Sequence, residues 1–234
     1  GGGYDFKGGT HYISILDKDN SLDFSTGQNL TIEIWIKPSE LISHRTILTK
    51  GRTAGTNYSN YAIRTNYQLL EFYYRNMADT SWHIYSSSTD VINVGLWHHI
   101  AITYNIGKGN SIKMYVNGDL VTGSWSTGTG NDDPYVTNDP LFIGAVNFTG
   151  TLSQVFNGTI DEIKIYNRTL SSSQIYQNYI AGASKRNSNL IVFNETSAGE
   201  EWLCSVTPND GYTDGITKNS SSVYIPNIEE ISGN

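Results

Sequence analysis

Carboxylates and histidines are the side chains whose chemistry we consider first, because they carry out most acid–base and metal-dependent reactions in proteins. Hydrolysis of a glycosidic bond requires two carboxyl groups about 5 to 10 Å apart, which on one strand face means acids two or four residues apart. No Glu-x-Asp-x-Glu run or equivalent exists, and the best acidic pair, Asp161 and Glu162, consists of neighbours that would point to opposite faces. Gly-x-Ser-x-Gly, His-Glu-x-x-His and phosphate-loop motifs are missing as well. The sequence therefore predicts a protein that is not an enzyme.

Two further groups of residues could bind a metal ion. His98 and His99 are adjacent in a predicted strand, so their side chains face opposite sides of the sheet and cannot ligate one ion. Residues 17–23 (DKDNSLD) place oxygen-bearing side chains at alternate positions, as an EF-hand calcium loop does. They lack that loop's sixth-position Gly, which is Leu22 here, and its twelfth-position Glu, which is Gln28. We therefore expect structural histidines and a plain polar loop.

Aromatic side chains could bind sugar rings by stacking. Trp82 begins a short predicted strand, residues 82–86, where an aromatic residue can equally serve the packing of the sheet. Trp125 lies in the stretch 123–133 (GSWSTGTGNDD), which its composition predicts to be a mobile loop. An exposed Trp on a loop is the better candidate, because binding residues concentrate on loops. Trp125 and Trp82 are therefore the predicted ligand-binding residues.

The elements that must position these residues are predicted to be β-strands. Apolar residues alternate at 98–104 and again at 112–116, with turns at 105–110 (NIGKGN) and at Asn117-Gly118, so the stretch 97–121 predicts two successive hairpins. A chain of 234 residues with 23 Gly and 16 Tyr indicates an all-β fold. One helix is predicted at 169–182, where Ser171 and Gln174 form a capping box.

Four segments resemble, in order, the strands of the laminin-G-like, concanavalin A-like jelly-roll family. They are YDFKGGTHYI (4–13), LTIEIWIKP (30–38), WHHIAITY with IKMYVNG (97–118), and FNGTIDEIKIYNRTL (156–170). The resemblance covers residues 4 to 182. It implies a two-sheet antiparallel jelly-roll sandwich, with one short C-terminal helix, over residues 1–183.

The resemblance also implies one structural calcium ion. Related jelly-rolls hold calcium between the first and last strands, which places Asp161 on the closing strand as a ligand and Asp5 on the first strand as the second contributor. Lys7 departs from the family pattern, because it replaces an acid and brings a positive charge nearby.

Residues 184–234 resemble the last strands of an immunoglobulin-like domain, as found beside laminin-G-like modules in large archaeal surface proteins. Three strand-like runs are far fewer than the roughly seven strands of such a sandwich, so the resemblance implies that another copy or an upstream fragment supplies the missing strands. Cys204, the single cysteine, would form its disulfide with that missing half. Alternatively the strands pack on the jelly-roll and Cys204 stays a free buried thiol. The expected interface residues are Val192, Trp202, Val206, Val223 and Ile225.

The expected location is extracellular or at the cell surface, chiefly because of the resemblance. Two functions remain open: a non-enzymatic interaction module of a surface or filament-forming protein, binding other protein chains, and a carbohydrate-binding module. A net charge of −7 without a basic block argues against nucleic-acid partners, and no apolar run approaches the length of a membrane span. Glycosylation sequons, which chance alone produces in a chain this rich in Asn, Ser and Thr, occur at Asn29, Asn57, Asn147, Asn157, Asn167, Asn194 and Asn219.

Overall fold

The computed structural model describes residues 3–52, 58–78, 81–148, 151–183, 197–203, 205–206 and 216–225. The chain divides into two compact units, Gly1–Tyr179 and Ile180–Asn234, whereas the sequence predicts a boundary after residue 183. No helix in the described part of the chain is long and apolar enough to span a bilayer.

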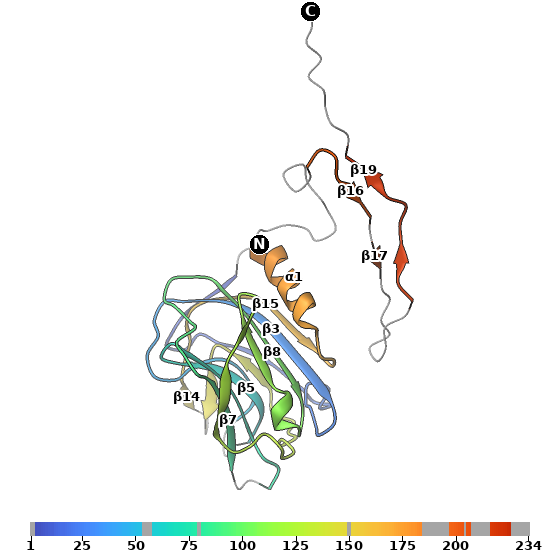
Figure 1. Cartoon of the computed structure of the whole chain (residues 1–234). Helices are drawn as coiled ribbons and strands as arrows, with labels where there is room; N and C mark the ends of the chain where they lie inside the picture. Colours follow the sequence, from blue (N-terminus) through green and yellow to red (C-terminus); the bar gives the residue numbers. More distant parts are fainter. Residues whose placement is uncertain are drawn as a thin grey trace, which may run out of the picture. The chain divides into compact units, whose positions relative to one another are not determined.

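The first unit is a sandwich of two antiparallel sheets (Figure 1). The six-stranded sheet has the order β1 (Tyr4–Lys7), β15 (Asn157–Tyr166), β3 (Asn29–Pro38), β8 (His98–Asn105), β9 (Lys113–Val116) and β10 (Asp119–Val121). The seven-stranded sheet has the order β11 (Gly123–Thr127), β7 (Trp82–Ser87), β6 (Leu69–Arg75), β5 (Ser59–Asn66), β4 (Arg45–Gly51), β12 (Leu141–Ile143) and β2 (Ile13–Ile15). The predicted two-sheet antiparallel fold is confirmed.

The core lies between the two sheets and follows the alternation in the sequence. In β3, Ile32, Ile34 and Ile36 are fully buried, and in β8 the same holds for Ile100 and Ile102. These strands pair along their whole length, from Asn29 opposite Asn105 to Ile36 opposite His98. The Asn117-Gly118 turn joins β9 to β10 with positive φ angles at both residues, which a two-residue hairpin of this type requires.

The first segment of the chain connects the two sheets. A bulge or bend is predicted at Gly8-Gly9, and both residues have positive φ angles. The structure shows more than a bulge, because β1 pairs with β15 in one sheet while β2 pairs with β12 in the other. Glycine permits this crossing since it adopts positive φ without steric cost.

Besides strand β11 (Gly123–Thr127), two features of the sandwich have no counterpart in the sequence prediction. A hairpin of β13 (Val146–Phe148) and β14 (Thr151–Ser153) follows β12, and a short 3₁₀ helix, η1 (Gly109–Ser111), lies in the turn between β8 and β9.

Helix α1 (Ser172–Ala183) covers the outer face of the six-stranded sheet. Its Ile175 is buried in a small cluster with Ala101, Tyr115 and Leu170. The Oγ of Ser171 accepts a hydrogen bond from the amide of Gln174, as the predicted cap requires.

The buried carboxylate of Glu33 lies beneath this helix. Tyr166 donates a hydrogen bond to it at 3.0 Å, Asn178 donates at 2.9 and 3.0 Å, and the Nε2 of His99 lies 3.5 Å away. Burial alone would raise the pKa of Glu33, but hydrogen bonds from His99, Asn178 and Tyr166 outweigh it and hold that pKa below its ordinary value.

In the second unit, the described strands form two antiparallel pairs. β16 (Glu201–Trp202) pairs with β19 (Val223–Tyr224), and β17 (Ser205–Val206) pairs with β18 (Lys218–Asn219). An immunoglobulin-like sandwich is not confirmed by these pairs and stays a prediction.

We predict that Glu33→Gln lowers the free energy of unfolding by about 1–3 kcal/mol at neutral pH. The glutamine side chain would place its own N–H donors against the donors of the surrounding residues, which leaves buried hydrogen bonds unmade. The folded-state pKa of Glu33 lies below its unfolded value, so its stabilisation is present above the unfolded pKa and is lost as the pH falls through the folded pKa. Urea unfolding should therefore show a smaller loss of stability below about pH 4.5 in the variant than in the wild type. Glu162→Gln, at an exposed position, is the control; equal losses in wild type and Glu33→Gln would contradict the prediction.

Candidate ligand-binding face

The outer side of the seven-stranded sheet, away from the core, carries aromatic and guanidinium groups, of which Arg52, Arg75 and Trp82 are partly exposed. β7 alternates across this sheet, so the buried His83 stacks inward on Tyr74 with ring centroids 4.7 Å apart. Trp82 therefore points outward, where it is half-buried and meets the ring of Tyr73 edge to face at 5.7 Å. The structure thus places Trp82 at a partly exposed position on the outer side of this sheet, above the buried Tyr73.

Two arginines lie against this indole. The guanidinium carbons of Arg52 and Arg75 are each 5.2 Å from the centroid of the Trp82 ring, and Arg52 also lies 5.1 Å from the ring of Phe148. Cation–π contacts of this kind hold a guanidinium group in place. The N–H groups of Arg52 can then donate paired hydrogen bonds to a carboxylate or sulfate group.

A third arginine, Arg64, belongs to the same surface and forms an ion pair with Glu71. The Nε of Arg64 donates to Glu71 at 2.6 Å, and its guanidinium carbon lies 4.5 Å from the Tyr73 ring centroid. Asn66 and Ser86 donate to the other oxygen of Glu71. We call Arg52, Arg64, Tyr73, Arg75 and Trp82 the Trp82 face. The sequence predicts its tryptophan but not its arginines, because Arg52 follows β4 while Arg64 and Arg75 lie in β5 and β6, and only the fold brings them together.

The structure corrects the expectation for Trp125. This residue lies in strand β11, opposite Tyr85, and is half-buried against the core rather than on a mobile loop. Its Nε1 donates to the carbonyl of Gly109 at 2.9 Å. The run of Gly, Ser and Thr around Trp125 lacks the apolar alternation from which a strand is predicted. Trp125 and Trp82 consequently lie on opposite faces of the seven-stranded sheet and cannot bind one ligand together.

A hollow of about 470 Å³ lies beside Trp125. It is lined by Gly107, Lys108, Gly109, Asn110, Trp125, Thr129 and Asn131. Most of this lining is backbone and polar side chains, and the ring of Trp125 is packed so closely on Gly130 that an added Cβ would lie 2.0 Å from it. The hollow is therefore a weaker candidate for sugar stacking than the Trp82 face.

His83 holds one wall of this hollow. Its Nδ1 accepts hydrogen bonds from the amides of Thr129 and Gly130 at 3.2 and 2.9 Å, which requires an unprotonated nitrogen. Burial lowers the pKa of His83, although the Asp132 carboxylate, 2.9 Å from Nε2, opposes this. The neutral form of His83 is therefore the form that supports this wall.

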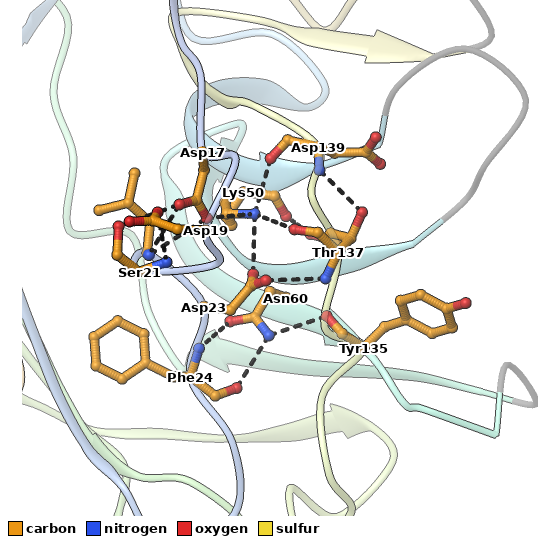
Figure 2. Close-up of polar contacts among 12 residues, drawn as sticks. Asp17, Asp19, Ser21, Asp23, Phe24, Lys50, Asn60, Tyr135, Thr137 and Asp139 are labelled. Carbon is orange, nitrogen blue, oxygen red and sulfur yellow. Dashed lines mark hydrogen bonds and ion pairs between the residues drawn. The ribbon is translucent and has the colours of Figure 1, made fainter.

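A buried charge cluster lies between the end of β4, the segment after β2 and the segment before β12 (Figure 2). The Nζ of Lys50 lies 3.1 Å from Asp17 and 3.0 Å from Asp23, and it donates to the carbonyls of Thr137 and Asp139. We call this group the Lys50 cage. The expectation of a plain polar loop at residues 17–23 is therefore wrong, because both terminal aspartates of that loop are buried beside an ammonium group.

The predicted calcium ligands lie at the edge of the six-stranded sheet. Asp5 pairs opposite Thr159, so Asp5 and Asp161 lie diagonally on one face. Asp5 is exposed, and Asp161 accepts a hydrogen bond from the amide of Glu162. In the described part of the chain, no three His, Cys, Asp or Glu side chains gather as a metal site. Two carboxylates alone do not fit the six to eight oxygens of calcium, and calcium here stays a prediction.

The predicted interface residues of the tail are only partly described. Trp202 pairs opposite Val223, which is 61% exposed, and its Nε1 donates to Glu200. The amide of Ile225 donates to the carbonyl of Glu200. For Val206 only the backbone is described, in β17. Val192 and Cys204 lie outside the described residues.

The sequons differ in accessibility. Asn167 and Asn219 are exposed, whereas Asn29, Asn147 and Asn157 are partly buried. The side-chain oxygen of Asn29 also accepts hydrogen bonds from Asn105 and Thr169. Asn57 and Asn194 lie outside the described residues. Glycosylation stays a prediction at all seven positions.

Comparison with known proteins identifies one family. Residues 7–176 match the model of the Laminin_G_3 family, described as the concanavalin A-like lectin/glucanases superfamily. The chain is 26% identical over 153 residues to adhesion G-protein coupled receptor V1 of Danio rerio, a stretch that is 64% of this chain but 2% of the receptor.

Solved structures share the fold. The CBM40 module of the Ruminococcus gnavus IT-sialidase, bound to α2,3-sialyllactose, matches with a TM-score of 0.60 and 16% identity, over 76% of this chain and 96% of the module. A K499G mutant of the NanB sialidase from Streptococcus pneumoniae matches with a TM-score of 0.59 and 19% identity, over 75% of this chain and 27% of the sialidase.

We predict that the wild type loses stability as the pH falls from about 7 to 5, because a histidine with a lowered folded-state pKa stabilises above its unfolded pKa and ceases to do so as it is protonated. Burial also lowers the pKa values of His44 and His98, so His83→Gln should reduce this loss of stability and not abolish it. Chemical denaturation at each pH measures the effect, with the exposed His11→Gln as control. An unchanged pH dependence in His83→Gln would exclude this role.

For the calcium prediction, a saturating excess of Ca²⁺ should raise the wild-type melting temperature by about 5–10 °C relative to chelator. Asp161→Ala should abolish that shift, and Asp119→Ala, at an exposed position on β10, should keep it. A melting temperature that chelator does not move would count against calcium at this edge.

Proposed function

The chain belongs to the concanavalin A-like lectin/glucanases superfamily, and from this we propose that it is a non-enzymatic extracellular interaction module that binds acidic glycans through the Trp82 face. The observation that carries the proposal is a half-buried, outward-pointing indole with two guanidinium groups at 5.2 Å. The wider family hosts many functions on one scaffold, so the argument depends on this site.

The chemistry of the face suits a sugar that carries an anionic group. An indole offers an apolar surface to the C–H side of a sugar ring, and arginine binds carboxylates and sulfates bidentately. The pair of Arg64 and Glu71 fixes the neighbouring Tyr73 beneath this surface. A rigid first layer of this kind lowers the entropic cost of binding.

The comparisons support the class of ligand and the location without assigning a site. One structural neighbour is a carbohydrate-binding module in complex with α2,3-sialyllactose, and the receptor that shares sequence similarity is named for adhesion. On this basis we propose that this chain meets its partners outside the cell or at its surface.

We predict that a glycan array shows binding to sialylated or sulfated glycans over their neutral counterparts, and that Trp82→Ala weakens the best of these interactions tenfold or more, the expected loss for a central aromatic anchor at about 1.4 kcal/mol per decade. Arg52→Gln with Arg75→Gln should remove the preference for acidic glycans, because the guanidinium groups recognise the anion.

Trp97→Ala is the matched control. Trp97 is 41% exposed and precedes β8 of the other sheet, where it contacts Trp35. The Trp97→Ala variant should bind glycans as the wild type does. Wild-type binding by Trp82→Ala, or loss of binding only in a Trp125 variant, would place the site elsewhere.

Assembly with other protein chains through the tail is a second candidate function. The observation that favours it is the exposure of apolar side chains: Val223 and Tyr224 in β19 are 61% and 60% exposed, and Ile216, just before β18, is 85% exposed. Strand pairs with exposed apolar residues add strands from another chain readily. The immunoglobulin-like completion of this tail, and a disulfide through Cys204, are part of this proposal.

For this second function we predict concentration-dependent association of the full chain at micromolar concentrations, measured by analytical ultracentrifugation. Val223→Lys should weaken association at least tenfold by placing a charge in the buried contact. Val94→Lys, at a position 52% exposed on the sandwich, should not. A strictly monomeric chain whose residues 216–225 are protected from hydrogen exchange would contradict tail-mediated assembly.

A further inference from the structure

The Lys50 cage has the composition of a cation site. Its four oxygen donors are two aspartate carboxylates and two backbone carbonyls, from Asp17, Asp23, Thr137 and Asp139, at 2.5 to 3.1 Å from the Nζ of Lys50. Figure 2 shows these groups converging on the ammonium from separate segments of the chain. Carboxylates and carbonyls in combination are what a hard divalent cation such as Ca²⁺ selects.

The cage is closed to solvent. The side chain of Lys50 is 0% exposed, and those of Asp17 and Asp23 are 1% and 3% exposed. Further hydrogen bonds fix the residues that supply these oxygen atoms. Asp23 accepts a hydrogen bond from the backbone amide of Thr137 at 2.9 Å, and the side chain of Asn60 bonds to both the backbone amide and the backbone carbonyl of Phe24. Both ends of the loop 17–23 are therefore fixed by contacts with the rest of the sandwich.

The charge within the cage is not balanced. Two carboxylates face one ammonium, which leaves an excess of one negative charge in a buried space. Burial raises the pKa of Asp23, the Lys50 ammonium opposes this, and the Asp17 carboxylate adds to the rise. A divalent ion would neutralise the two carboxylates fully.

We propose that the oxygen atoms of the Lys50 cage form a site of the kind that binds a divalent cation. In the wild-type protein the ammonium group of Lys50 takes the place of that cation. The wild-type protein therefore needs no metal at this corner, and removal of the lysine side chain opens a site for Ca²⁺. With both carboxylates bidentate and two carbonyls, the cage provides up to six oxygens, which is within the range that calcium uses. This inference is independent of glycan binding and of calcium at Asp161.

The test is Lys50→Ser in the full chain. In chelator, this variant should melt about 10 °C or more below the wild type, because two buried carboxylates lose their counter-charge. Millimolar Ca²⁺ should recover most of that loss, and isothermal titration calorimetry should detect one more bound Ca²⁺ per chain than in the wild type. If the variant does not fold in chelator, refolding in the presence of Ca²⁺ replaces the melting experiment.

Three further variants test whether the response to Ca²⁺ comes from binding in the cage or from general effects of Ca²⁺ on the protein. Lys50→Met loses the charge but keeps most of the side-chain volume, so it should be destabilised without recovery by Ca²⁺. Asp23→Asn combined with Lys50→Ser should lose the additional site. Lys164→Ser removes a lysine whose pair with Glu162 is exposed, and it should gain no Ca²⁺ response.

Failure of Ca²⁺ to stabilise or refold Lys50→Ser, or an equal recovery of Lys50→Met, would overturn the proposal. Tighter Ca²⁺ binding by the wild type than by Lys50→Ser at this cage would overturn it as well.

Discussion

The buried ammonium of Lys50 is the interaction that holds together the corner of the sandwich from which the chain leads to the Trp82 face. It connects the segment after β2, the end of β4 and the segment before β12, and so reinforces the pairing of β12 with β4 and β2. Removing one partner of such a buried pair costs about 3–5 kcal/mol, a large part of the stability of a typical domain. Its position also matters for the ligand-binding face. Gly51 and Arg52 follow directly with positive φ angles, so the cage fixes the turn that carries Arg52 to Trp82.

The sandwich itself determines which surface is available to a ligand. The outer face of the six-stranded sheet is occupied by helix α1, whose Tyr179 stacks on Trp35 at 5.9 Å and whose Asn178 binds Glu33. The outer face of the seven-stranded sheet carries Trp82 with its arginines instead. The hollow beside Trp125 lies on the core side of that sheet, and its wall depends on the neutral form of His83. In our proposal the outer face of the seven-stranded sheet serves recognition, whereas helix α1 covers that of the six-stranded sheet.

Local pattern predicted the parts of this structure that local interactions determine. Alternating isoleucines in β3 and β8, the Asn117-Gly118 turn and the cap at Ser171 were all recognisable, because each depends on neighbours in sequence. Strand β11 was missed because Ser, Thr and Gly carry no apolar alternation, and only pairing with β7 makes it a strand. The Lys50 cage was missed for a related reason: its donors lie 27 to 89 residues from Lys50 along the chain, and an acidic loop without its partner resembles any polar turn.

The central claim is that an acidic glycan binds at the Trp82 face. The five tryptophans of the chain allow the position of the bound glycan to be measured directly. Each indole N–H gives its own signal in a ¹⁵N-correlated nuclear magnetic resonance spectrum, so a titration with α2,3-sialyllactose, with lactose as the neutral comparison, reports where the ligand lies. The account predicts that the Trp82 signal shifts with sialyllactose while those of Trp35, Trp97 and Trp125 stay in place. Shifts confined to Trp125 or Trp202, or equal shifts with lactose, would contradict it.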